Sequence, residues 1–245
     1  MIGVSALLAG VGGATGVVVL ATGSPAGQAA TSLPVTPPAA PPPATAPDPG
    51  SSAEPGTTVA RPAKIHLRKS RSRGSHTSGR LRRGVQLPAS GVHYTTWDPI
   101  LRRGPNRHWR RWGHDRALRT ILRVIKSHRK ANPGSPRVLV GDISRPRGGD
   151  FGIRYGKPGH ASHQIGLDVD IYYPRRDRRE IAPTRFGHVD PVPSQDLVSR
   201  FVSAGATFVF VGPKTGLRGP RRVVMPLAHH DNHLHVRFPA QPDGR

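Results

Sequence analysis

The sequence has no cysteine among its 245 residues, which excludes disulfide bridges and every metal site that depends on thiolates. Acidic side chains are scarce as well: 14 Asp and Glu stand against 37 Lys and Arg, for a formal net charge of +23. A charge of this size does not predict a fold, but it indicates polyanionic surroundings such as nucleic acid, anionic lipid or an anionic cell wall. Only histidine, aspartate and glutamate remain to bind a metal ion.

Several signatures of large enzyme classes are missing too. The chain has no internal repeat, no phosphate-binding P-loop, no dinucleotide-type GxGxxG and no GxSxG nucleophile elbow. The sequence therefore gives no support to chemistry of these kinds.

Residues 1–30 have the composition of an export signal. Residues 2–22 carry no charge, and the small residues Gly27 and Ala29 suit a processing site after Ala29. A positively charged start is missing, so either the chain begins upstream or this segment stays as a weak membrane anchor, for which about 20 apolar residues suffice. We expect cleavage and export to a periplasmic, secreted or cell-wall-associated location, with membrane contact only where the segment is retained.

Residues 31–86 are predicted to be a disordered linker of two parts. Proline, alanine, threonine, serine and glycine dominate residues 33–63, a composition that cannot bury enough apolar surface to offset the entropy of ordering. Residues 64–83 instead carry many arginines among serines and glycines. Two interpretations of this basic arm stay open: it holds the protein on an anionic cell-wall polymer, or it is only a soluble tail.

The compact domain is expected to span residues 87–245, with an α+β fold in which a small, mainly antiparallel sheet is flanked by helices. An apolar stripe at helical spacing predicts a first helix that is opened by His114 and Asp115 and ended by residues 132–134. The second helix is predicted to be capped by Ser194 and stopped by Gly205. Strands are expected at residues 137–143, 207–211, 223–224 and 232–238.

Two polar stretches carry the chemistry that the sequence offers: GHASHQIGLDVDI at residues 159–171 and HHDNHLHVRF at residues 229–238. Residues i and i+2 of a strand share a face, so His233 and His235 project together if their segment is extended. Two imidazoles and one carboxylate are what an open zinc site needs, with water in the fourth position. An isolated H-x-H pair is equally compatible with a solvated pair, but here both stretches show strand-like apolar alternation.

The two stretches, in this order, resemble the penicillin-insensitive murein endopeptidases, within the wider group of lysostaphin, D-Ala-D-Ala and hedgehog-type zinc peptidases that share H-x6-D and H-x-H motifs. The similarity covers about residues 137–239. It implies a Zn2+ ion bound by His163, Asp170 and His235.

The same resemblance implies roles for the remaining polar residues. His233 is expected to act as the general base, with His230 as a second imidazole near the attacking water. His160 falls on a histidine of the family's GHASHQ segment and is expected to be an accessory metal residue or a neighbour of the ligands. Asp168 has two open interpretations, which are orientation of a ligand imidazole and an ordinary salt bridge with an arginine.

The predicted function is that of an exported zinc metallopeptidase that hydrolyses peptide cross-links of peptidoglycan by metal-activated water. The resemblance, the expected export and the basic charge together imply stem peptides as substrates, cut at the bond from D-alanine to diaminopimelate. Arg145 and Arg147 precede the first metal stretch and are candidates to grip a substrate carboxylate. Endopeptidase and carboxypeptidase action both remain open, because members of the wider group share these ligands.

The alternative is a basic module that binds a wall polymer or nucleic acid and whose histidines hold a non-catalytic metal or none. The charge favours it. Structural zinc sites, however, are closed by four protein ligands, whereas this sequence has histidines to spare. We therefore expect an enzyme, with no nucleic acid among its partners.

Overall fold

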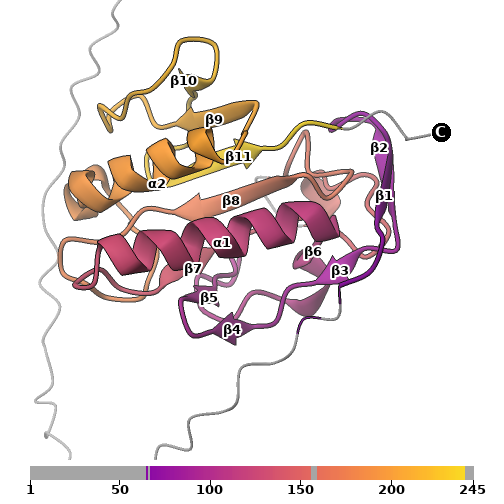
Figure 1. Ribbon diagram of the computed structural model, residues 1–245, viewed down its shortest axis with the longest axis horizontal. Helices are drawn as coiled ribbons and strands as arrows, with labels where there is room; N and C mark the ends of the chain where they lie inside the picture. The colour runs from indigo at the N-terminus through magenta and orange to yellow at the C-terminus, as the bar shows by residue number, and fades with distance from the viewer. Residues whose placement is uncertain (1–64, 66, 156–158, 241–245) are drawn as a thin grey trace, which may run out of the picture. The chain divides into compact units, whose positions relative to one another are not determined.

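The computed structural model describes residues 65, 67–155 and 159–240, so the predictions for the export segment and the proline-rich part of the linker lie outside it. A seven-stranded sheet runs through the domain in the order β10-β9-β11-β8-β7-β5-β4 (Figure 1). Neighbouring strands are antiparallel except in the pairs β10–β9 and β5–β7, which confirms the predicted α+β class. The strands are β4 (Ser90–Gly91), β5 (Tyr94–Thr96), β7 (Val138–Val140), β8 (Asp168–Tyr172), β9 (Phe208–Val211), β10 (Val224–Pro226) and β11 (His233–Arg237).

Two helices, α1 and α2, lie side by side against one face of this sheet (Figure 1). α1 (Asp115–Ala131) begins after His114 and ends before Asn132, as predicted. Its apolar stripe is buried, including Leu118 and Ile121, while arginine and lysine side chains occupy the exposed side. The helix is therefore held by packing of one face onto the sheet.

α2 (Pro191–Ser203) begins earlier than predicted. The prediction that Ser194 caps it is wrong, because the Asp190 carboxylate accepts a hydrogen bond from the Val192 amide and proline occupies the first helical position. Ser194 lies in the first turn, where its hydroxyl donates to the Asp190 carbonyl at 2.5 Å. The predicted stop at Gly205 is confirmed: its φ of +84° is a left-handed conformation that glycine adopts without strain.

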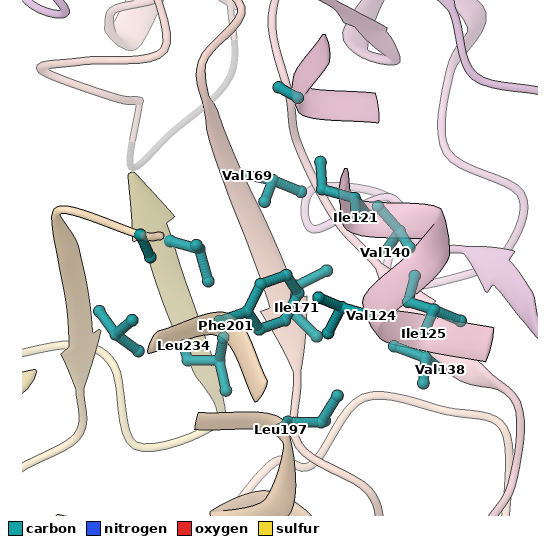
Figure 2. Close-up of a cluster of buried hydrophobic side chains, with 14 of the residues drawn as sticks. Ile121, Val124, Ile125, Val138, Val140, Val169, Ile171, Leu197, Phe201 and Leu234 are labelled. Carbon is teal, nitrogen blue, oxygen red and sulfur yellow. The ribbon is translucent and has the colours of Figure 1, made fainter. Parts of the chain in front are cut away.

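The two faces of the sheet differ because side chains alternate along each strand. Val169 and Ile171 of β8, with Leu234 and Val236 of β11, lie on the helix side and are 0% exposed. They join apolar residues of both helices, such as Phe201, in one core cluster (Figure 2). The alternate residues of the same two strands therefore lie on the face away from the helices.

The prediction that residues 31–86 form one disordered linker is wrong for its basic end, which is folded. β1 (Arg71–Gly74) and β2 (Gly79–Arg82) form an antiparallel hairpin. The ordered domain therefore begins before residue 87 and includes part of the basic arm.

The hairpin is ordered because it docks onto the domain. Leu81 is 2% exposed, and its amide donates to the Arg147 carbonyl at 2.9 Å. The Ser72 hydroxyl donates to the Ile165 carbonyl at 2.7 Å. These contacts give a short, polar segment partners for its backbone and a buried apolar anchor, neither of which its composition reveals.

A two-stranded sheet, β3 (Val85–Gln86) with β6 (Trp112–Gly113), joins the end of the hairpin to the segment before α1. Three short 3-10 helices lie in the loops: η1 (His108–Arg110), η2 (Ile153–Tyr155) and η3 (Phe186–His188). Over the part of the chain that the structure describes, no helix has the length and apolar character needed to cross a membrane.

Candidate metal centre

The candidate site lies on the sheet face away from the helices, where β8 and β11 run as antiparallel neighbours. Their register places Asp170 directly opposite His235, and polar pairs follow two residues away on either side. Opposed residues of an antiparallel pair share a face and have Cβ atoms roughly 4.5–5.5 Å apart. Strand pairing therefore brings the two sequence motifs together, although 65 positions separate these residues.

Three side-chain atoms, from His163, Asp170 and His235, form a compact group that we call the ligand triangle. His163 Nε2 lies 3.1 Å from His235 Nδ1 and 3.4 Å from Asp170 Oδ1, and the latter two atoms are 3.1 Å apart. A tetrahedral zinc ion with bonds of about 2.0–2.1 Å needs ligand atoms roughly 3.3 Å apart. The donor types and their spacing thus fit a metal ion, and the structure brings the three predicted ligands together.

A second set of donors is also close: His160, His163 and Asp170 have ligand atoms within 4.8 Å of one another. This set is looser, because His160 Nε2 lies 3.7 Å from Asp170 Oδ2. The same nitrogen lies only 2.8 Å from Asp142 Oδ2, so it is hydrogen-bonded to this carboxylate and presents no lone pair to a metal ion. The triangle that includes His235 is the better donor set, with His160 beside it.

His163 has an unusual backbone conformation. Its φ of +68° lies in the left-handed region, which costs a residue with a Cβ atom roughly 1–3 kcal/mol. Two hydrogen bonds stabilise it: the His163 amide donates to Asp168 Oδ2 at 3.1 Å, and Nδ1 lies 2.7 Å from the Ile143 carbonyl oxygen. Because a carbonyl only accepts, Nδ1 carries the proton, and the Nε2 lone pair faces the triangle.

The His235 imidazole lies between two carboxylates. Its Nδ1 is 3.1 Å from Asp170 Oδ1, and its Nε2 is 3.0 Å from Asp168 Oδ1, which also accepts from Arg237 Nε at 2.7 Å. Asp168 thus makes both contacts considered from the sequence, the imidazole and the arginine. Burial by itself lowers the pKa of His235, but its hydrogen bonds with Asp168 and Asp170 raise the pKa to about 9. The two carboxylates therefore favour a positive charge at the His235 ring.

His233 and His230 lie beside the ligand triangle. His233 Nε2 is 4.0 Å from Asp170 Oδ1, while its Nδ1 lies 2.7 Å from Asn232 Oδ1. Burial lowers the pKa of His233 to about 4, so its ring is neutral at physiological pH. His230 packs against it with ring centroids 4.7 Å apart, and His230 Nδ1 lies 2.8 Å from the Ala228 carbonyl oxygen. The structure thus groups both predicted catalytic histidines with the predicted ligands.

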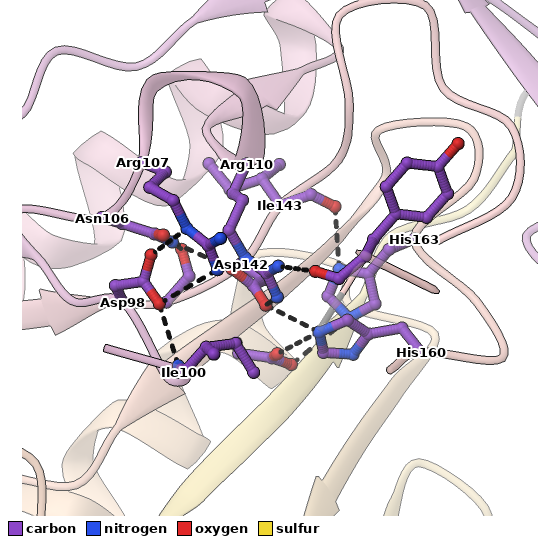
Figure 3. Close-up of polar contacts among 12 residues, drawn as sticks. Asp98, Ile100, Asn106, Arg107, Arg110, Asp142, Ile143, His160 and His163 are labelled. Carbon is purple, nitrogen blue, oxygen red and sulfur yellow. Dashed lines mark hydrogen bonds and ion pairs between the residues drawn. The ribbon is translucent and has the colours of Figure 1, made fainter. Parts of the chain in front are cut away.

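A further buried carboxylate, that of Asp142, supports His160 (Figure 3). It accepts hydrogen bonds from Arg110 Nε at 2.7 Å and from Asn106 Nδ2 at 2.9 Å. Burial by itself raises the pKa of Asp142, but hydrogen bonds from Arg110 and His160 lower the pKa to about 2. Burial likewise disfavours the charged form of His160, yet the charges of Asp170 and Asp142 raise its pKa. The network fixes His160 through an ion pair in the domain interior.

Sequence reasoning missed this network. Asp142 follows the apolar strand β7, where it was included in a core strand and given no role. Arg110 is 1% exposed although it lies in a strongly basic stretch whose arginines look like surface residues. The available signal was an aspartate directly after a buried strand, because buried carboxylates are rare unless they are paired.

The buried carboxylates of Asp168, Asp142 and Asp170 differ in their partners. Arg237 pairs with Asp168 and Arg110 pairs with Asp142, whereas the ion-pair partners of the Asp170 carboxylate among the described residues are all imidazoles. A buried carboxylate is costly unless a proton, a charged partner or a metal compensates it. Burial raises the pKa of Asp170, but the surrounding imidazoles hold it well below its usual range. Asp170 is therefore where a metal cation is electrostatically favoured.

Arg145 and Arg147 are placed away from the ligand triangle. Both line a cavity of 580 Å3 together with Arg80, Arg154 and Gln164, the last being the chain neighbour of a predicted ligand. The two residues predicted to bind substrate thus lie in the wall of a cavity that is distinct from the ligand triangle. This cavity borders the first metal motif through Gln164.

Fold and site together define a class: an α+β protein whose sheet carries a buried His/His/Asp cluster compatible with a metal ion. Comparison with known sequences identifies the family within this class. Residues 72–200 match the family model of the penicillin-insensitive murein endopeptidases. The matched region contains His163 and Asp170 and starts inside the basic hairpin.

Individual relatives agree with the family model. A penicillin-insensitive murein endopeptidase of Haemophilus influenzae is 36% identical over 114 residues, which cover 46% of this chain and 35% of that protein. The proteins of that name from Salmonella heidelberg and Salmonella newport are each 30% identical over 207 residues, covering 71% of this chain and 68% of theirs. This chain belongs to the penicillin-insensitive murein endopeptidase family.

Proposed function

We propose that this protein is a zinc-dependent endopeptidase that hydrolyses the peptide cross-links of peptidoglycan, at the bond from D-alanine to diaminopimelate. The observation that carries the proposal is the ligand triangle of His163, Asp170 and His235, with its donor atoms 3.1 to 3.4 Å apart. Family membership supports a peptidase that acts on murein.

The three triangle residues would hold the ion, and their surroundings are suited to that task. The Ile143 carbonyl accepts a hydrogen bond from His163 Nδ1, and Asp168 accepts one from His235 Nε2, so each ring presents its other nitrogen to the triangle. When bound, zinc supplies a Lewis acid that polarises a carbonyl group and lowers the pKa of a water ligand to about 7.

His233 is the proposed general base. Asn232 Oδ1 accepts a hydrogen bond from His233 Nδ1, which leaves the Nε2 lone pair free to take a proton from the attacking water. The same nitrogen then returns the proton to the leaving amine, so one water is consumed, the amide bond breaks, and a carboxylic acid and an amine form without an acyl-enzyme. His230, which packs against the His233 ring, would steady the imidazole while it carries the proton.

The arrangement of His160 supports an enzyme over a structural metal site. A structural zinc site takes a fourth protein ligand. The nearest additional imidazole is that of His160, and Asp142 engages it at 2.8 Å, while 3.7 Å separates it from Asp170. Among the described residues, three donors form the triangle with spacings that suit one ion, and three is the number of protein ligands in catalytic zinc sites.

We further infer that the protein acts outside the cytoplasm, on the cell wall. The uncharged composition of residues 2–22 supports export, and the net charge of +23 suits an anionic wall. Exposed arginines of the β1–β2 hairpin would add contacts with an anionic polymer.

The decisive experiment is digestion of a defined cross-linked muropeptide dimer by the zinc-loaded full chain, with products identified by mass. We expect two monomers that together contain one additional water, loss of the reaction with a chelator and its return with zinc. The matched control is His108→Ala, an exposed histidine outside the cluster, which should behave as wild type. A protein that binds zinc yet releases no peptide would contradict the proposal and favour a binding module.

A further inference from the structure

We infer that the cavity between the β1–β2 hairpin and the loop after β7 is a subsite for a free carboxylate of the substrate peptide. This inference rests on the proposed function, because it names the part of the substrate that is recognised away from the scissile bond. The cavity measures 580 Å3 and gathers arginines from three separate segments. They are Arg80 of β2, Arg145 and Arg147 of the loop, and Arg154 of η2.

The charges that line the cavity do not balance. Asp150 is its single acidic residue and is engaged by Arg154, whose Nε lies 3.0 Å from Asp150 Oδ2. Arg145 donates to the Asp150 carbonyl at 2.6 Å. Arg80 and Arg147 form no ion pair with any carboxylate in the described ranges. Two guanidinium groups are thus available to an anion, and a carboxylate suits them because it accepts two parallel hydrogen bonds from one guanidinium.

The backbone holds these two arginines together. The amide of Leu81, which follows Arg80, donates to the carbonyl of Arg147 at 2.9 Å. Gly148 follows with a φ of +64°, and a Cβ atom there would lie 2.0 Å from the Gln164 carbonyl oxygen. Only glycine permits this close approach, so the chain is built to bring the hairpin and the loop into contact. Because the two backbone positions are fixed next to each other, no backbone ordering is needed to bring both side chains to one anion.

The cavity is connected to the ligand triangle. Gln164 in its wall is the chain neighbour of His163, and Tyr155 in its wall contacts Phe151 with ring centroids 6.4 Å apart. Phe151 in turn lies 6.1 Å from the His163 ring. The cavity wall is therefore linked to His163 through one chain neighbour and two aromatic contacts. The free carboxylates of a stem peptide are the anions that the proposed substrate offers to this basic wall.

The test compares two cross-linked muropeptides that differ only in whether their carboxylates are free or amidated. Wild type is expected to favour the free acid roughly 10-fold to 100-fold through KM, the effect of one charge-assisted hydrogen-bonded pair. Arg80→Gln combined with Arg147→Gln should abolish this preference by raising KM for the free acid to its value for the amidated substrate, while zinc content stays at the wild-type level. Arg119→Gln, an arginine with a 56% exposed side chain on α1, is the matched control and should keep the preference.

Several outcomes would overturn the inference. Equal cleavage of both substrates by wild type, or an unchanged preference in the double variant, refutes the subsite and leaves the proposed function intact. Cleavage of neither substrate refutes the proposed function, and calorimetric binding of the same two uncleaved peptides then decides the subsite by the same preference. Binding of poly(glycerol phosphate) that the double variant loses, without discrimination between the peptides, would assign the cavity to a wall polymer instead.

Discussion

The two faces of the β8–β11 strand pair are both buried, yet they affect the stability of the domain in opposite directions. On the helix side, Val169, Ile171, Leu234 and Val236 are 0% exposed and apolar, and each stabilises the fold by about 1.5–3 kcal/mol. On the other side, Asp170 is 5% exposed and charged. Burial of such a group costs stability unless every atom has a partner. One face therefore holds the domain together, and the other uses part of that stability to maintain a charged cluster.

A finer contrast lies within the polar face. His233 and His235 are two residues apart on one strand, yet burial lowers the pKa of His233 to about 4 while that of His235 is raised to about 9. The difference comes from hydrogen bonds, since His235 contacts two carboxylates and His233 contacts the Asn232 amide. Position on the strand decides which face a histidine occupies, and its partners decide what charge it carries.

The largest effect is expected from breaking the ligand triangle. His163→Ala, Asp170→Ala and His235→Ala should each lose most bound zinc and all measurable turnover, because an open site with three ligands cannot spare one. Metal analysis by mass spectrometry, beside turnover on a muropeptide dimer, checks this. A variant with full zinc content and normal turnover would remove that residue from the ligand set.

The next effect concerns the contrast between the two histidines of β11. His233→Ala should retain zinc and a folded domain while losing roughly 10²- to 10⁴-fold in turnover, the usual contribution of general acid–base catalysis. Metal content and kcat of His233→Ala and His235→Ala, measured side by side, provide the test. The roles would have to be exchanged if His233→Ala lost the metal and His235→Ala kept it.

On the apolar face, the opposite pattern is expected. Leu234→Ala, next to His235, should lower the free energy of unfolding by about 2–5 kcal/mol through lost burial and the cavity left behind. Its turnover and zinc content below the unfolding transition should match wild type. Urea denaturation measures the change, with Leu101→Ala, 47% exposed, as a control expected to shift stability by less than about 0.5 kcal/mol. Unchanged stability in Leu234→Ala would contradict the division between the faces.

The smallest effect comes from the carboxylate that supports His160. The folded-state pKa of Asp142 is about 2, below its ordinary value of 3.8, so its stabilising contribution is present above pH 3.8 and is lost as pH falls toward 2. This amounts to about 2 kcal/mol in all and about 1 kcal/mol between pH 5 and pH 3. Wild type should lose that much more stability than Asp142→Asn over this interval in urea denaturation. Parallel losses in both proteins would show that Asp142 is not the titrating group.

Several features of the fold were predictable because they are periodic. The stripe of α1 and the alternation in β8 and β11 follow from residue spacing, and Gly205 marks a helix end through its own backbone freedom. The cap of α2 was not predictable with the same certainty, because Asp190 and Ser194 both have side chains that can cap.

The folded hairpin shows a different limit. Composition described residues 64–83 as a polar, arginine-rich tail, and no local pattern distinguished Leu81 from an exposed leucine. The hairpin docks through the Leu81 amide on the Arg147 carbonyl and the Ser72 hydroxyl on the Ile165 carbonyl, and both partners are far away in the sequence. Order in this segment results from docking, and docking is a property of the whole domain.

The sequence by itself determined which atoms were available to a metal and, through a spacing of two, that His233 and His235 share a strand face. It also determined that this face is backed by aliphatic residues. Only the tertiary structure decided that β8 and β11 pair in the register that opposes Asp170 to His235. It likewise decided that Asp142 supports His160. The physical reason is that spacing along a strand is local and periodic, whereas the partners of a buried charge come from distant segments that meet only when the core is packed.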